Sequence, residues 1–122
     1  MASVPFYPVL FPAREAGKGS RVAIAAPWWS LAEQVIRFDQ NRPGVYELGN
    51  ATGTVVYIGS SDDVQRRLLD HAKAGSTTCI ARHATQYRVE YSGDDPVARA
   101  RELYDEHVRT FGAPPACNES RP

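Results

Sequence analysis

The stretch from Pro43 to His71, PGVYELGNATGTVVYIGSSDDVQRRLLDH, decides the fold of this chain. It contains two short runs rich in β-branched and aromatic residues, at 44–48 and 54–58. The cluster between them contains glycine and asparagine, which accept the backbone conformations of tight turns at low cost. Two such runs around a Gly/Asn turn predict an antiparallel hairpin.

A helix is predicted directly after the hairpin. Ser60 or Ser61 is expected to cap it, and the two aspartates that follow place negative charge in its first turn, where the helix dipole favours it. Val64, Leu68 and Ala72 recur at four-residue spacing, so we expect them to form the buried stripe of this helix.

Polar side chains repeat the same spacing on a neighbouring face of this helix, at Arg67 and His71. Each strand of the predicted hairpin carries a tyrosine close to a glycine: Gly44 with Tyr46, and Tyr57 with Gly59. The arginine and the histidine are therefore expected to project back toward the two tyrosines.

This order of residues resembles the GIY-YIG nuclease superfamily. The tripeptides here are G-V-Y and Y-I-G, Tyr57 follows Tyr46 by eleven residues, and Arg67 follows Tyr57 by ten. The likeness continues with the histidine four residues later, a glutamate in a later helix and a terminal Pro-Ala-Cys-Asn at 115–118. Six elements occur in the family's order, and the chain resembles a small single-domain member.

The resemblance implies an α/β fold in which a small three-stranded antiparallel sheet is flanked by helices. It places the catalytic domain at 43–118, after an N-terminal extension at 1–42 and before a C-terminal tail at 119–122.

The other elements are read from local patterns. Tyrosine and valine alternate with arginine and glutamate at 87–91, which predicts the third strand. A long helix is expected to begin after Asp95, with Pro96 in its first turn, and to end at Gly112. The remaining predictions are an extended edge segment at 4–12, a turn at 15–21, a strand at 22–26, a helix at 30–38 and a helical turn at 80–84.

The resemblance implies an endonuclease that hydrolyses phosphodiester bonds in DNA and leaves a 5′-phosphate and a 3′-hydroxyl. It assigns one divalent cation, Mg²⁺ or Mn²⁺, to Glu102, and hard cations of this kind accept a single carboxylate together with waters and phosphate oxygens. Glu106, one turn further on the same face, is the competing carboxylate, and Glu102 is preferred for its distance from Asn118.

The other roles follow the motif position by position. Arg67 is expected to bind a non-bridging phosphate oxygen, because a planar guanidinium does this better than an ammonium group. Tyr46 or Tyr57 would orient or deprotonate the attacking water, and His71 would share the base role or orient a tyrosine. The resemblance gives structural roles to Gly44, Gly59 and Asn118.

Two departures from the family leave the base and the biological role open. Ser60 stands where many repair-type members carry a lysine. The loop after the first family helix offers a serine and two threonines at 76–78, where several members carry a histidine or a lysine. Repair, restriction and mobility all stay open.

The charge distribution bears on a nucleic-acid partner. Fourteen basic and fourteen acidic residues give a net charge of zero, whereas a stand-alone DNA-binding protein is usually basic. Residues 64–88 nevertheless carry five basic residues against one acidic, and residues 89–106 carry six acidic against two basic. The residues expected to contact nucleic acid are Arg66, Lys73, Arg82 and Arg88.

The rival interpretation is a module with this fold that binds nucleic acid or protein without cleaving. The balanced charge favours it. A homodimer or a larger protein partner is the further alternative. Trp28 and Trp29 are expected to anchor on the core, with stacking on bases or a place at the protein contact as the alternatives.

The expected redox state of the two cysteines depends on the cellular compartment of the protein. No apolar run of about 18 residues is present, so no membrane span is predicted, and the N-terminus lacks the pattern of a signal peptide. We therefore expect a cytoplasmic protein with free thiols. A zinc site is the alternative, with the ligand set Cys79, His83, His107 and Cys117.

Overall fold

The computed structural model describes residues 23–92 and 94–122. Within these residues the chain forms four strands and four helices, in the order β1 (Trp29–Ser30), α1 (Glu33–Ile36), β2 (Gly44–Gly49), β3 (Val55–Ser61), α2 (Val64–Ala72), α3 (Cys79–His83), β4 (Gln86–Tyr91) and α4 (Pro96–Phe111). The predictions at 4–12 and 15–21 lie outside the described residues. The strand predicted at 22–26 is wrong for residues 23–26, which are irregular although Ile24 is buried.

The predicted hairpin is confirmed, since β2 and β3 pair antiparallel. β2 also pairs antiparallel with β4 and lies inside the sheet. The sequence predicted three strands, whereas the described residues form four, in the order β1-β4-β2-β3. β1 adds only Trp29 opposite Tyr87 and Ser30 opposite Gln86, and two residues are too few for an alternating pattern to be recognised.

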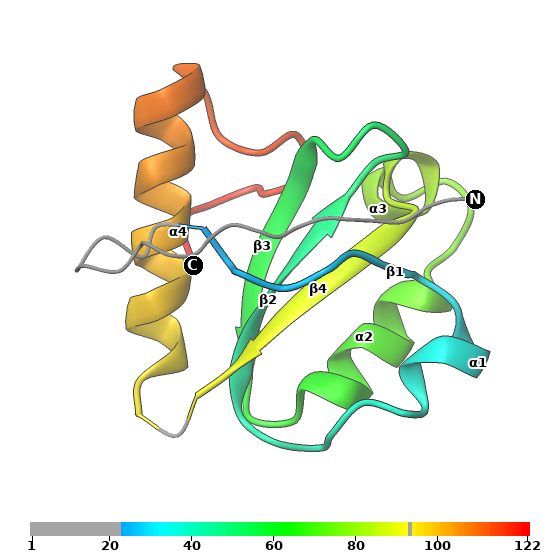
Figure 1. The fold of residues 1–122 in the computed structure, drawn as a ribbon. Helices are drawn as coiled ribbons and strands as arrows, with labels where there is room; N and C mark the ends of the chain where they lie inside the picture. Colours follow the sequence, from blue (N-terminus) through cyan, green and yellow to red (C-terminus); the bar gives the residue numbers. More distant parts are fainter. Residues whose placement is uncertain (1–22, 93) are drawn as a thin grey trace.

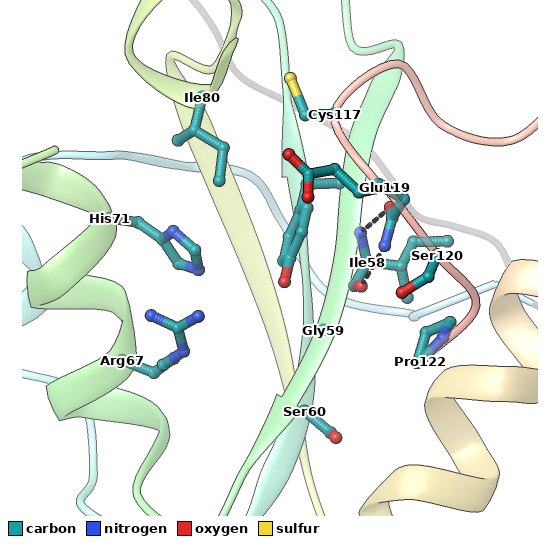
Figure 2. A pocket seen from close by; sticks show the side chains of 12 residues that line it. Ile58, Gly59, Ser60, Arg67, His71, Ile80, Cys117, Glu119, Ser120 and Pro122 are labelled. Carbon is teal, nitrogen blue, oxygen red and sulfur yellow. Dashed lines mark hydrogen bonds between the residues drawn. The ribbon is translucent and has the colours of Figure 1, made fainter. Parts of the chain in front are cut away.

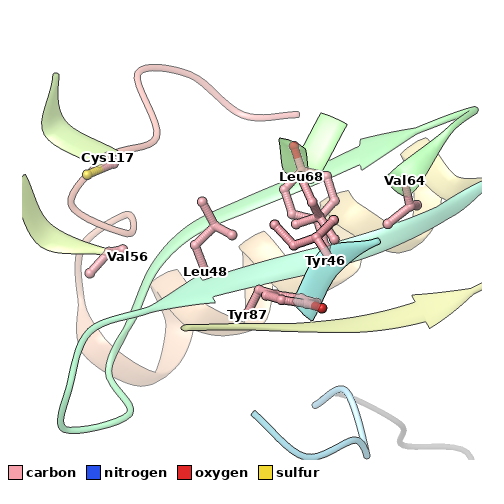
Figure 3. Close-up of a cluster of buried hydrophobic side chains, with 8 residues drawn as sticks. Tyr46, Leu48, Val56, Val64, Leu68, Tyr87 and Cys117 are labelled. Atoms are coloured by element: carbon pink, nitrogen blue, oxygen red, sulfur yellow. The ribbon is translucent and has the colours of Figure 1, made fainter. Parts of the chain in front are cut away.

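The sheet lies between two helical layers (Figure 1). Neighbouring side chains of a strand point to opposite faces, so Val45 belongs to one buried cluster and Tyr46 to the other. On one face α4 supplies Ala100 and Leu103 to the cluster of Val45. On the other face α1 and α2 cover the larger cluster (Figure 3), which contains Ile36, Tyr46, Leu48, Val56, Val64, Leu68, Tyr87 and Cys117. Helices α2 and α4 therefore lie on opposite faces of the sheet.

Short-range signals fix the ends of the helices. The side chain of Asp63 caps α2, so the cap predicted at Ser60 or Ser61 is wrong, and both serines belong to the end of β3. Asp95 caps α4 as predicted, and Gly112 ends that helix with a left-handed φ of 78°. No helix in the described part of the chain is long and apolar enough to span a bilayer.

A disulfide joins Cys79, at the start of α3, to Cys117 in the C-terminal segment. The prediction of free thiols is therefore wrong. The zinc alternative is wrong as well, because both cysteines of that ligand set are already bonded to each other. Within residues 23–92 and 94–122, no three histidine, cysteine or acidic side chains gather closely enough to hold a metal ion.

Candidate active site

A cleft of about 440 Å³ opens between α2, the start of α3, β3 and the C-terminal segment (Figure 2). Three of the predicted catalytic residues, Tyr57, Arg67 and His71, line it. The full lining consists of Tyr57, Ile58, Gly59, Ser60, Arg67, His71, Ile80, Cys117, Asn118, Glu119, Ser120 and Pro122.

Tyr46 forms a buried pair with His71 beside this cleft. Its hydroxyl lies 2.8 Å from Nε2 of His71, and the two side chains are 1% and 7% exposed. Burial, assisted by the positive charge of Arg67, lowers the pKa of His71 from 6.5 to about 4. Burial and then the neighbouring Tyr57 raise the pKa of Tyr46 above its ordinary value. At neutral pH a protonated phenol therefore faces an uncharged imidazole, and the two groups share one hydrogen bond.

Tyr57 is the tyrosine that reaches the cleft. Its ring is stacked on that of Tyr46 with centroids 6.1 Å apart, and it meets the ring of His71 edge-on at 5.2 Å. Gly59 makes this arrangement possible, because a Cβ there would lie 2.6 Å from the Tyr46 hydroxyl oxygen. Gly44 is constrained by backbone instead, since its Cβ would lie 2.7 Å from the carbonyl oxygen of Glu90 in β4.

Arg67 brings a positive charge to the cleft from α2. Its side chain is 44% exposed, and its nearest acidic partner is Asp70 at 3.9 Å. A contact of this length between two exposed side chains is weak, so the guanidinium keeps most of its donors for a ligand. Figure 2 shows it beside His71, on the opposite wall of the cleft from β3.

The C-terminal segment is fastened along the outer edge of β3. The N–H of Cys117 donates to the carbonyl oxygen of Val56 at 2.7 Å. The side-chain amide of Asn118 accepts from the N–H of Ile58 at 2.9 Å and donates to its carbonyl oxygen at 3.0 Å. This strand edge and the disulfide together hold the segment that carries Glu119 as one wall of the cleft.

Glu102 is not brought to this cleft. It lies on α4, across the sheet from α2, in a separate depression lined also by Glu90 and Arg99. Its carboxylate accepts from Nη1 of Arg99 at 2.7 Å, and the same buried guanidinium donates to both carboxylate oxygens of Glu90. Glu106, the competing carboxylate, pairs with Arg109 on the same helix.

The residues predicted to contact nucleic acid divide into two groups. Arg88 is already paired within the fold, because its Nε donates to the carboxylate of the buried Glu47 at 2.7 Å and its guanidinium lies over the ring of Trp28. Lys73 lies 3.6 Å from Glu33 on the surface. Arg66 and Arg82 belong to the surfaces of α2 and α3 and are exposed.

Only one acidic side chain, Glu119, is among the described residues that line the cleft. Mg²⁺ and Mn²⁺ bind oxygen ligands, and Mg²⁺ accepts one carboxylate completed by waters and phosphate oxygens. The donor set of the cleft fits such a cation through Glu119, whereas the carboxylate of Glu102 is held by a guanidinium. Sequence reasoning missed Glu119, although it directly follows the asparagine of the terminal motif.

Comparisons with known proteins identify the family to which this chain belongs. The family model described as a domain of unknown function (DUF7508) matches residues 22–110. None of the curated proteins compared with the chain matches it.

Solved structures with the same fold include the GIY-YIG N-terminal endonuclease domain of UvrC from Thermotoga maritima. A point mutant bound to its catalytic divalent cation is 20% identical, with a TM-score of 0.53, and the match covers 71% of this chain and 93% of that chain. The magnesium-bound domain is 21% identical, with a TM-score of 0.50 and coverages of 70% and 92%. The likeness shows that this chain has the fold of a GIY-YIG domain.

Proposed function

Because this chain belongs to the family described as a domain of unknown function, DUF7508, and has the fold of a GIY-YIG endonuclease domain, we propose that it hydrolyses phosphodiester bonds in DNA. The observation that carries the proposal is the convergence of Tyr57, Arg67 and His71 on one cleft, with the hydroxyl of Tyr46 bonded to the histidine. The products would be a 5′-phosphate and a 3′-hydroxyl.

Arg67 binds the phosphate in this proposal. Hydrolysis of a phosphodiester develops negative charge on the non-bridging oxygens, and a fixed positive charge at the cleft wall stabilises that charge. The weak contact with Asp70, at 3.9 Å, is given up at little cost when the phosphate arrives.

Tyr57 orients the attacking water, because its ring lines the cleft whereas Tyr46 is buried. His71 and Tyr46 act as positioning residues: their hydrogen bond fixes two rings against which Tyr57 packs. His71 stays uncharged at neutral pH because its pKa is about 4, so it does not compete with Arg67 for the phosphate.

A divalent cation, Mg²⁺ or Mn²⁺, bound in the cleft would neutralise phosphate charge and lower the pKa of a coordinated water. The similar UvrC domain is bound to its catalytic divalent cation in these structures, and in one of them the cation is magnesium. Glu119 is the carboxylate that the cleft offers to it.

The proposal is tested by incubating the purified chain with supercoiled plasmid, branched DNA and RNA, with Mg²⁺ and with a chelator. We expect Mg²⁺-dependent cleavage of DNA that Arg67→Ala reduces at least 100-fold. Arg109→Ala, which removes a guanidinium of α4 paired with Glu106, is the control and should cleave like wild type. Equal cleavage by the Arg67 and Arg109 variants, at unchanged melting temperatures, would refute the proposal.

A non-cleaving binding module is the second candidate function. The net charge of zero and the ion pair of Arg88 with Glu47 favour a protein over a nucleic acid as the partner of such a module, because both reduce the positive charge offered to a phosphate backbone. Weak DNA binding without any Mg²⁺-dependent nicking would support the protein-binding module, whereas salt-dependent DNA binding without nicking would support a module that binds nucleic acid.

A further inference from the structure

The disulfide joins two walls of the cleft. Cys79 is the first residue of α3, the helix that contributes Ile80 to the lining, and Cys117 lines the cleft from the C-terminal segment. Figure 2 shows Ile80 and Cys117 at the same end of the cleft. One covalent bond therefore connects two lining segments that are separated by 38 residues in the sequence.

The helix α3 has few buried contacts with the rest of the domain. Cys79 and Ile80 are half-buried, and the other three residues of this helix are exposed. Residues 75–78, which lead into the helix, are exposed as well. Elements with few buried apolar contacts open at the lowest free energy in a folded protein. We therefore expect the position of α3 to depend on the disulfide.

The C-terminal segment also depends on this bond. Its hydrogen bonds to β3 come from the N–H of Cys117 and the side-chain amide of Asn118, the bonded cysteine and the residue directly after it. Further along, an ion pair between the exposed side chains of Arg121 and Asp105 connects the segment to α4, and such pairs contribute little stability. The disulfide therefore reinforces the segment at the point where it meets β3.

The two sulfur atoms differ in accessibility, which determines how the bond is reduced. Cys117 is 8% exposed, whereas Cys79 is half-buried on a surface helix. Thiol–disulfide exchange requires a thiolate to reach one of the two sulfurs. A dithiol reductant would attack Sγ of Cys79, the bond between the protein sulfurs would break, and Cys117 would leave as a thiolate. The second thiol of the reductant would then displace Cys79, so that the reductant becomes a disulfide and the protein gains two electrons and two protons.

We infer that the bond between Cys79 and Cys117 is a redox switch of the cleft, operated by exchange with a dithiol. The oxidised chain holds α3 in place and Asn118 against β3, beside Tyr57. In the reduced chain both walls separate from β3, while the sheet stays folded because β2 keeps its pairing with β3 and β4. The inference rests on the proposed function only for the effect of the switch on DNA cleavage.

The structural part is tested on the full chain, oxidised and after treatment with dithiothreitol. Both cysteines of the sequence form this bond, so the dithiol acts on it alone. We expect reduction to shift the amide NMR signal of Ile58 and to raise the rate of tryptic cleavage after Arg82 in α3 at least tenfold. The signals of β2 should stay dispersed. The double variant Cys79→Ser/Cys117→Ser should resemble the reduced chain with or without dithiothreitol.

A matched control separates the switch from a general loss of stability. Leu103→Ala opens a cavity in the buried cluster on the α4 face, away from the disulfide. The oxidised Leu103 variant should be less stable than wild type and should keep the Ile58 signal at its wild-type position. A shift of this signal equal to that caused by reduction would overturn the inference.

The functional part is tested by DNA cleavage at graded ratios of reduced to oxidised dithiothreitol. Cleavage should follow the oxidised fraction, fall at least tenfold on full reduction and return on reoxidation. Unchanged Ile58 signals and tryptic rates after reduction, or a sheet that unfolds on reduction, would overturn the inference. If the walls loosen but neither form cleaves DNA, the switch stands and the endonuclease proposal fails. If both forms cleave DNA equally well, the endonuclease stands and the switch fails.

Discussion

Asn118 satisfies both backbone groups of Ile58 with a single side chain, at 2.9 Å to the N–H and 3.0 Å to the carbonyl oxygen. Ile58 lies in β3, at the edge of the sheet, between Tyr57 and Gly59 of the motif. The asparagine therefore takes the place of a neighbouring strand at the point where the cleft needs a fixed backbone.

Replacing this amide should loosen the edge of the sheet. Asn118→Ala removes two hydrogen bonds, and at about 1 kcal/mol each we expect a loss of about 2 kcal/mol in the free energy of unfolding. Urea unfolding measures it, with the exposed Asn41→Ala as control. DNA cleavage should fall in parallel, because Glu119 follows the released residue. An unchanged urea midpoint would contradict the assigned role.

A methyl group at position 59 should disturb the tyrosine pair. In Gly59→Ala the new Cβ would lie 2.6 Å from the hydroxyl oxygen of Tyr46 and 2.8 Å from Cε2 of Tyr57, so the rings must move. Overpacking of this kind costs about 1–3 kcal/mol. Gly75→Ala is the matched control, because a Cβ there meets nothing within 4 Å. Thermal melts and cleavage rates of the two variants should differ clearly.

Reduction of the disulfide should destabilise the chain. The bond closes a loop with a sequence separation of 38 residues, for which chain entropy gives about 4 kcal/mol. The double variant Cys79→Ser/Cys117→Ser should match the reduced wild-type chain in urea unfolding, and reductant should leave the double variant unchanged. Equal stability of oxidised and reduced wild-type chains would show that the bond contributes nothing.

The stability of the fold should decrease between pH 7 and pH 5 because of His71. The pKa of His71 is about 4 in the folded chain and 6.5, the ordinary value of a histidine, in the unfolded chain. Over this pH range the unfolded chain therefore binds a proton that the folded chain does not. Proton linkage predicts that the free energy of unfolding falls by about 2 kcal/mol by pH 5. This contribution of His71 to stability is fully present above pH 6.5. Urea unfolding of His71→Gln at both pH values should give a flatter dependence. An equal slope in both chains would refute the assignment.

Local patterns predicted the parts of the fold that short-range signals determine. The alternation at 87–91 placed β4, and Asp95 with Gly112 bounded α4, because caps and turns act within a few residues. β1 has no comparable signal, since a two-residue strand is formed only by pairing with β4. The domain boundaries at 1–42 and 43–118 stay predictions.

The candidate site was predicted in part. Spacing along a strand and a helix brought Tyr57, Arg67 and His71 together, because these elements pack directly against one another. Spacing along α4 does not specify which face of the sheet that helix covers, so Glu102 was expected at the cleft but lies across the sheet. The disulfide was missed because a reducing compartment was assumed, and a cytoplasmic location stays a prediction.

The segment at Cys117 and Asn118 has a consequence for self-association. It occupies hydrogen-bonding groups of Val56 and Ile58 along the outer edge of β3, and exposed strand edges are templates on which other chains add. A chain cut before Cys117 would bare this edge. Such a shortened protein should form aggregates that scatter light, while the full chain stays monodisperse.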